Sequence, residues 1–131
     1  MKNLKIYLVA VFIFLIIDFV WLGFVANNFY QNQIGFLLRE QFLLIPAIIF
    51  YLLFVFGLLI FAILPAVEKN SWKVALFLGG LFGLITYATY DLTNFATIKN
   101  WPFIVVVIDL IWGIFISATV STLTFLFVQK K

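Results

Sequence analysis

The order of apolar and polar residues divides the chain into four long apolar segments separated by short polar ones. A helix needs about 20 consecutive apolar residues to cross the hydrocarbon core of a bilayer. Each of the four segments is long enough to do so. The pattern therefore predicts an all-α integral membrane protein with spans over about residues 6–25, 42–64, 72–95 and 102–128.

Polar residues and prolines interrupt the apolar segments at three places. The interruptions lie at residues 27–33, residues 65–71 and residues 99–100. Pro102 suits the first turn of the last helix, where its missing N–H is no loss. Short connections make neighbouring helices antiparallel. We therefore predict one transmembrane domain over residues 1–131, folded as a four-helix bundle.

The basic residues predict the orientation of this bundle. Four spans place both termini on one side, and Arg39 and Lys99 are the only basic residues on the other side. The side of the termini carries six basic residues: Lys2, Lys5, Lys69, Lys73, Lys130 and Lys131. An excess of Lys and Arg in short loops marks the cytoplasmic face. We expect cytoplasmic N and C termini in a multi-pass protein of a bacterial inner membrane.

The composition excludes several classes of protein. Hydrophobic residues make up 66% of the chain and charged residues 10%, whereas soluble domains have about 45–50% and about 25%. The chain has no Cys and no His, which excludes disulfides, thiolate chemistry, zinc sites, His-ligated haem and Ser–His catalysis. The net charge of +3 comes from residues that flank the spans, so we expect no nucleic-acid partner.

Three aspartates interrupt the apolar helices. Asp18, Asp91 and Asp109 fall inside the predicted spans, where an Asp at the helix centre costs about 2.5–3.5 kcal/mol. At a rise of about 1.5 Å per residue, Asp18 lies about 13 Å from the outer loop and Asp109 about 12 Å from Trp101. Asp91 is near the outer end of its own helix. A common depth in the outer half predicts one shared site.

The residues around these aspartates predict what would surround the site. Small residues at helical spacing, Gly79 with Gly83 and Gly113 with Ser117 and Ser121, allow helices to approach closely. Aromatic and amide side chains share the faces of the acids. The predicted ligand-binding residues are Asp18, Trp21, Tyr87, Tyr90, Asp91, Asn94, Asp109 and Trp112.

Two alternative interpretations apply to single residues. Polar residues in membrane bundles also join helices by hydrogen bonds worth about 0.6–2 kcal/mol each, without any further function. Trp72 and Trp101 stand at helix starts, where Trp is commonly an interfacial anchor. Trp21 and Trp112 lie deeper and are better candidates for the walls of a pocket.

The acids have no basic partner inside any span, so they are either protonated or bind a positive ligand. A proton, a metal ion held by oxygen ligands or an organic cation held between carboxylate and aromatic groups would fit. The sequence assigns no metal ligand, cofactor or catalytic residue. Small multidrug exporters share the four helices and the embedded acid, but their local motifs are absent.

Three acid-bearing segments resemble a known family. They are residues 18–23 (Asp-Phe-Val-Trp-Leu-Gly), 87–94 (Tyr-Ala-Thr-Tyr-Asp-Leu-Thr-Asn) and 109–113 (Asp-Leu-Ile-Trp-Gly). On these segments, the chain resembles the uncharacterised bacterial family numbered 2177 among domains of unknown function. The resemblance extends over essentially the whole chain. The resemblance implies a single four-span domain and no established activity.

The Asp-x-x-Trp pattern also occurs in both the first and last spans, which suggests an inverted repeat.

We interpret the sequence as a membrane protein whose outer-half pocket binds a small molecule, cation or proton for transport or sensing. One alternative is a membrane-embedded enzyme in which aspartates act as general acid and base on a lipid or isoprenoid. Another is an accessory subunit of a larger membrane complex. The expected partners are the bilayer and a small cation or lipid ligand, and homo-oligomerisation stays open.

Overall fold

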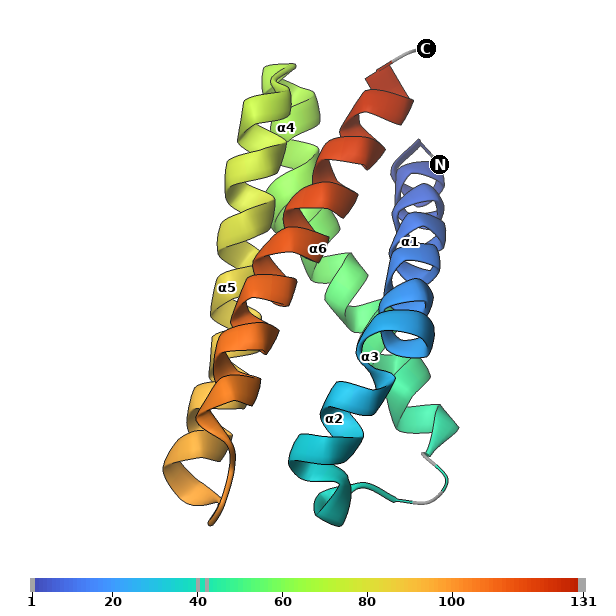
Figure 1. Cartoon of the computed structure of the whole chain (residues 1–131). Coiled ribbons are helices and arrows are strands. Elements are labelled where there is room, and N and C mark those ends of the chain that lie inside the picture. Colours follow the sequence, from blue (N-terminus) through green and yellow to red (C-terminus); the bar gives the residue numbers. More distant parts are fainter. Residues whose placement is uncertain (1, 40, 42, 130–131) are drawn as a thin grey trace.

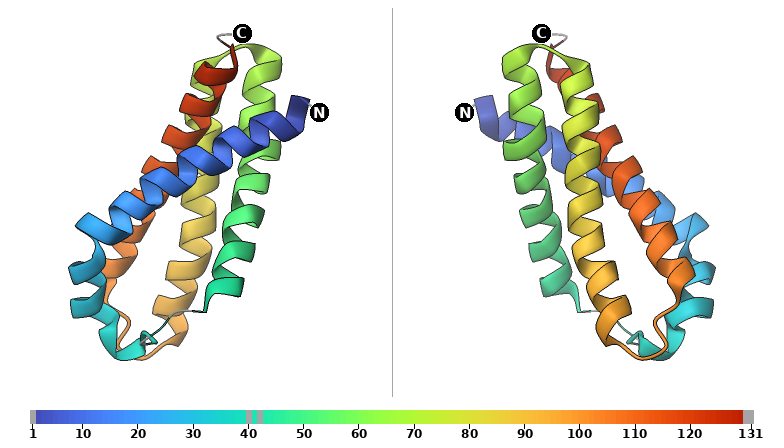
Figure 2. Two further views of the ribbon diagram at one scale, coloured as in Figure 1. Left: turned by 90° about the vertical axis from the view of Figure 1, so that its right-hand side faces the viewer. Right: turned by 90° about the vertical axis from the view of Figure 1, so that its left-hand side faces the viewer.

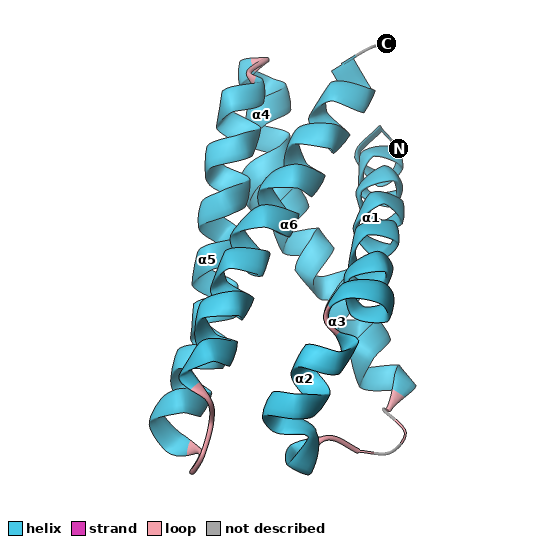
Figure 3. Cartoon of the chain, in the orientation of Figure 1, coloured by secondary structure: helices cyan, strands magenta, loops and turns pink. Residues whose placement is uncertain are grey.

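The computed structural model describes residues 2–39, 41 and 43–129, and this part of the chain contains helices and loops but no strand (Figure 3). The first helix, α1 (Lys2–Val20), continues into a π-helical turn, η1 (Trp21–Val25). A short helix α2 (Asn27–Ile34) and a 3-10 turn η2 (Gly35–Leu37) follow. The rest is α3 (Leu44–Leu58), the π-helical turn η3 (Leu59–Ile63), α4 (Leu64–Lys69), α5 (Trp72–Thr97) and α6 (Phe103–Gln129).

Four helical stretches are long and apolar enough to cross a membrane. They are Lys2–Val25, Leu44–Lys69, Trp72–Thr97 and Phe103–Gln129. The predicted all-α membrane bundle is confirmed, with boundaries that differ by a few residues. The predicted start of the second span, Phe42, lies outside the described residues. The first described residues of α1 and the last of α6 lie at the same end of the bundle (Figure 1).

The prediction that Pro65 ends the second span is wrong. The helix continues through α4 to Lys69, and Pro65 lies in the first turn of α4, directly after η3. A proline is tolerated there because the π-helical turn changes which carbonyl faces its missing N–H. The span ends at Asn70, whose φ of 51° is left-handed, and the Ser71 hydroxyl then accepts the Val74 N–H at 3.4 Å to begin α5.

The connection between the first and second spans is predicted as a loop, but residues 27–34 form α2. This polar segment is helical because its few apolar side chains pack on a surface formed by the connection between α5 and α6 and the start of α6. Ile34 is buried with Trp101, Val105 and Val106, and the rings of Phe29 and Tyr30 pack against this cluster. Tertiary packing thus orders a segment whose local composition is typical of a loop.

Helices α5 and α6 form the closest pair in the bundle and run side by side in Figures 1 and 2. A Cβ atom at Gly83 would overlap the carbonyl oxygen of Gly113, and one at Gly79 would lie 2.6 Å from the Ser121 hydroxyl. The small residues that the sequence singled out therefore do let the two backbones meet.

Helix α1 crosses the other helices obliquely (Figure 2). Its buried residues, Ile6, Ala10, Phe14 and Asp18, repeat every four positions. Phe14 lies in the main core, against Phe54 of α3. Asp18 therefore occupies the next position on the same buried stripe, which carries it into the interior.

Candidate functional site

The three aspartates of the spans are all buried, although they come from α1, α5 and α6. The exposed fraction is 5% for Asp18, 0% for Asp91 and 7% for Asp109. No Lys or Arg occurs within residues 6–25, 44–67, 74–97 or 103–129. The acids are thus held inside the bundle, with no basic side chain from the helix interiors beside them.

Asp18 is held by a tyrosine of α3. The Tyr51 hydroxyl donates to Asp18 Oδ2 at 2.7 Å, and the Tyr51 ring packs edge-on against Phe14, with ring centroids 5.4 Å apart. The indole N–H of Trp112 lies near the same carboxyl but has no hydrogen-bond partner. Asp18 therefore links α1 to α3 and faces α6.

Asp109 is held by a tyrosine from outside the spans. The Tyr30 hydroxyl of α2 donates to Asp109 Oδ1, and the indole N–H of Trp21 lies near Tyr30. Burial, and then the hydrogen bond to Asp109, raise the pKa of the Tyr30 phenol. The phenol therefore keeps its proton and remains a donor to the carboxyl.

Asp91 has a different environment from the other two acids. It is fully buried, and neither of its carboxyl oxygens has a hydrogen-bond partner. The carboxyl of Asp109 lies near it, and the buried indole of Trp101 is also nearby. A buried polar group without a partner costs free energy. The Asp91 carboxyl therefore lacks a hydrogen-bond partner that its burial calls for.

Two tryptophans connect the acid-bearing ends of α1 and α6. The rings of Trp21 and Trp112 stack with centroids 4.3 Å apart and planes 10° from parallel. Each follows an aspartate at the third position, Asp18 and Asp109 respectively. The π-helical turn η1 begins at Trp21, and such turns are frequent at functional sites.

The other predicted site residues divide into two groups. The half-buried Tyr87 packs on Gly113 and edge-on against Phe54, and it lies near all three aspartates. Tyr90 is 57% exposed, with Asn94 near its hydroxyl. Tyr87 is therefore central to the acid cluster, whereas Tyr90 and Asn94 lie at its edge.

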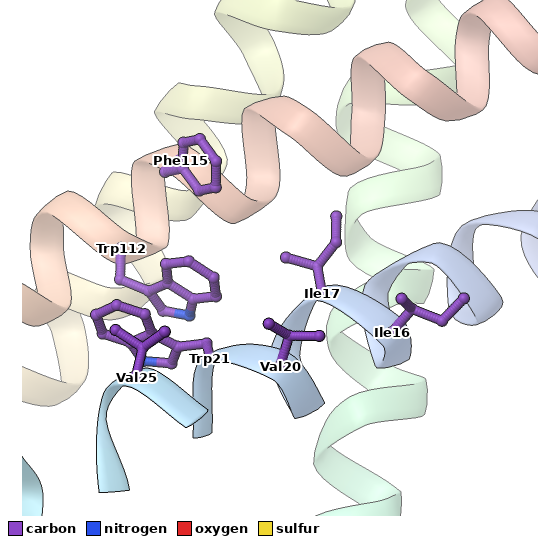
Figure 4. Close-up of a pocket in the computed structure, with 7 residues that line it drawn as sticks. All are labelled: Ile16, Ile17, Val20, Trp21, Val25, Trp112 and Phe115. Carbon is purple, nitrogen blue, oxygen red and sulfur yellow. The ribbon is translucent and has the colours of Figure 1, made fainter. Parts of the chain in front are cut away.

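An apolar cavity of about 280 Å³ adjoins the tryptophan pair (Figure 4). No aspartate lines it; the lining residues are Ile16, Ile17, Val20, Trp21, Val25, Trp112 and Phe115. Among the described residues, no group of three or more Asp, Glu, His or Cys side chains could hold a metal ion. The structure therefore brings Asp91 and Asp109 together inside the bundle, whereas Asp18 has separate partners in Tyr51 and Trp112.

Three residues of the cluster were not predicted as part of it. Tyr30 and Tyr51 supply the two hydroxyl donors, and Trp101 is buried beside Asp91 rather than exposed as an interfacial anchor. Its burial follows from the fold of α2, which covers it. Tyr51 had a signal in the sequence, because a tyrosine inside an apolar span needs a partner for its hydroxyl.

Comparison with known proteins supports the same classification. A family described as predicted membrane protein, DUF2177, matches residues 3–126. No curated protein and no solved structure matches the chain. The matched region contains all four spans almost completely, together with the three acid-bearing segments. This chain therefore belongs to the DUF2177 family of predicted membrane proteins.

Proposed function

We propose that this membrane protein takes up and releases a proton at the Asp91–Asp109 pair, as part of proton-coupled transport or of pH sensing. The observation that carries the proposal is the state of Asp91. Its carboxyl is fully buried, has no hydrogen-bond partner and lies beside a second carboxyl.

Electrostatics favours a proton between these two groups. An ionised carboxylate in a protein interior costs several kcal/mol unless it is paired and hydrogen-bonded. Two adjacent carboxylates in addition repel each other, so such pairs hold one proton in common. A proton on Asp91 would remove the charge of Asp91 and the repulsion between the two groups, and its O–H would donate a hydrogen bond to the carboxylate of Asp109.

The neighbours of the pair suit both states. The Tyr30 hydroxyl already donates to Asp109, as an ionised partner requires. The unpartnered indole N–H of Trp101 lies near Asp91, and it would donate to Asp91 once the proton has left. A group that has a partner before and after proton loss can cycle between the two forms.

The packing favours a proton over a larger cation. The cavity beside the tryptophan pair is lined by apolar groups and not by carboxyls. An organic cation at Asp91 would have to displace packed side chains, whereas a proton needs no additional space. Packing around Asp91 therefore favours transport or sensing in which the aspartate pair binds and releases a proton.

Infrared difference spectroscopy between acidic and alkaline buffer tests this assignment, because a protonated carboxyl has its own C=O stretching band. We expect the band in wild type and in Glu68→Gln, whose side chain is exposed in the last turn of α4. Asp91→Asn should abolish it, since no pair of carboxyls is then left to share a proton. If the band is absent from wild type, or survives unchanged in both Asp91→Asn and Asp109→Asn, the proposal is wrong.

Sealed vesicles containing a pH-sensitive dye then separate the two roles. A wild-type protein that transports protons should change the internal pH after an external pH jump, and Asp91→Asn should not. A protein that senses pH should leave the internal pH unchanged while showing the infrared band.

A further inference from the structure

We propose that the cavity between α1 and α6, lined by the residues named above, binds one fatty acyl chain of a lipid. This site is separate from the Asp91–Asp109 pair and does not depend on the proton chemistry proposed there.

The position of the cavity determines what can reach it. Ile16, Val20 and Val25 belong to the first membrane span, and Trp112 and Phe115 belong to the last. Side chains at its rim, among them Val20, Val25 and Phe115, are exposed on the outside of the bundle. In a membrane this outside is hydrocarbon, so the cavity opens onto the acyl chains of the bilayer.

The lining determines the chemistry of the occupant. In Figure 4 the side chains of Ile16, Ile17 and Val20 lie on one side, and the rings of Trp21, Trp112 and Phe115 lie on the other, with Val25 at the Trp21 ring. The only polar side-chain atoms of the lining residues are the indole nitrogens, and both are buried, near Tyr30 and Asp18. The cavity therefore presents apolar surface alone, which excludes a headgroup or a charged ligand and suits a hydrocarbon chain.

The volume of about 280 Å³ is enough for part of a chain. An apolar cavity of about 150 Å³ is sufficient to bind benzene. A site of this size and with this apolar lining suits a segment of one acyl chain.

The fluorescence of the tryptophan pair can report binding at the site, and the same two residues also border the buried aspartates. The apolar parts of Trp21 and Trp112 line the cavity, whereas their N–H groups lie near Tyr30 and Asp18. A chain in the cavity would therefore rest on the same two rings that border the acid cluster, and it would quench their fluorescence if it carried bromine.

The test uses the methyl ester of dibromostearic acid, added to the purified full-length protein in detergent. A Trp72→Phe background removes the exposed indole at the start of α5. We expect quenching that saturates with the mole fraction of the ester in the micelle. Val20→Phe, which fills the cavity, should lose most of the saturable quenching. Ile111→Phe, which places the same ring on an exposed position of α6 outside the lining, should keep it.

Several outcomes would overturn the site. Quenching that rises linearly and equally in all three proteins would show only non-specific contact with the micelle. Saturable quenching that Val20→Phe leaves unchanged would place the chain elsewhere. If a brominated prenyl ester saturates the signal and the stearoyl ester does not, the occupant is not an acyl chain. An oligomer that dissociates only in Val20→Phe would show that a second copy fills the cavity. Circular dichroism and gel filtration verify the fold of each variant.

Discussion

The indole ring of Trp21 lies flat on that of Trp112, with centroids 4.3 Å apart and planes 10° from parallel. The two rings come from the first and the last span. Each belongs to an Asp-x-x-Trp sequence, and the indole N–H of Trp112 lies near the aspartate of the other helix, Asp18. The stack therefore ties together the two segments that carry Asp18 and Asp109.

A double-mutant cycle should measure the interaction free energy between Trp21 and Trp112. Trp21→Leu and Trp112→Leu should each destabilise the protein, and the double variant should lose less than the sum by about 0.5–1.5 kcal/mol, the usual coupling of an aromatic pair. The measurement is the free energy of unfolding by titration with a denaturing detergent. Trp72→Leu with Trp112→Leu is the matched control and should be additive, because Trp72 lies at the start of α5. Additive losses for Trp21 and Trp112 would contradict the stack.

The contact between α5 and α6 should not tolerate a methyl group at Gly83. The added Cβ would overlap the Gly113 carbonyl oxygen, which is backbone and cannot move aside alone. We expect Gly83→Ala to lower the free energy of unfolding by about 1–3 kcal/mol or more. The loss should appear as a lower unfolding midpoint in the titration with denaturing detergent.

Gly80→Ala is the control within the same helix. Its Cβ would meet Ile114 and Ala118 at ordinary distances of 3.6 and 3.7 Å, and Ala favours a helix over Gly by up to about 1 kcal/mol. This variant should be as stable as wild type or more so. Equal losses at Gly83 and Gly80 would show that the helices do not approach as described.

The hydrogen bond from Tyr51 to Asp18 should contribute to stability. Tyr51→Phe keeps the ring against Phe14 but leaves a buried carboxyl oxygen without its donor. We expect a loss of about 1–3 kcal/mol. Tyr7→Phe should cost less, since the Tyr7 hydroxyl donates to the backbone carbonyl of Leu52 at an exposed position between the same two helices. A Tyr7 effect as large as that of Tyr51 would argue against a special role for Asp18.

The orientation in the membrane follows from the distribution of charge and can be tested with reporter fusions. Lys130 and Lys131 lie outside the described residues, but they join four other basic residues on the side of the termini. A reporter active only in the cytoplasm should therefore work at the C terminus and fail when inserted after Lys99. The reverse result would place the acid cluster in the inner half of the bilayer.

The sequence by itself determined the number of spans, the common side of the termini and the close approach of α5 and α6. These features follow from local rules. In hydrocarbon every backbone N–H and C=O group must find a partner inside its own helix, so an apolar run of sufficient length is a helix whatever surrounds it. Gly79 and Gly83 likewise allow close contact wherever a second helix of small residues is available.

Only the tertiary structure decided which side chains meet the buried aspartates. Tyr51 on α3 pairs with Asp18, and Tyr30 on α2 pairs with Asp109, while Asp91 receives no hydrogen bond. Helix rotation and crossing angle select these partners, and both result from how whole side-chain surfaces interlock. The folding of α2 over Trp101 has the same origin, because a polar segment of eight residues becomes a helix only where its few apolar side chains find a surface to cover.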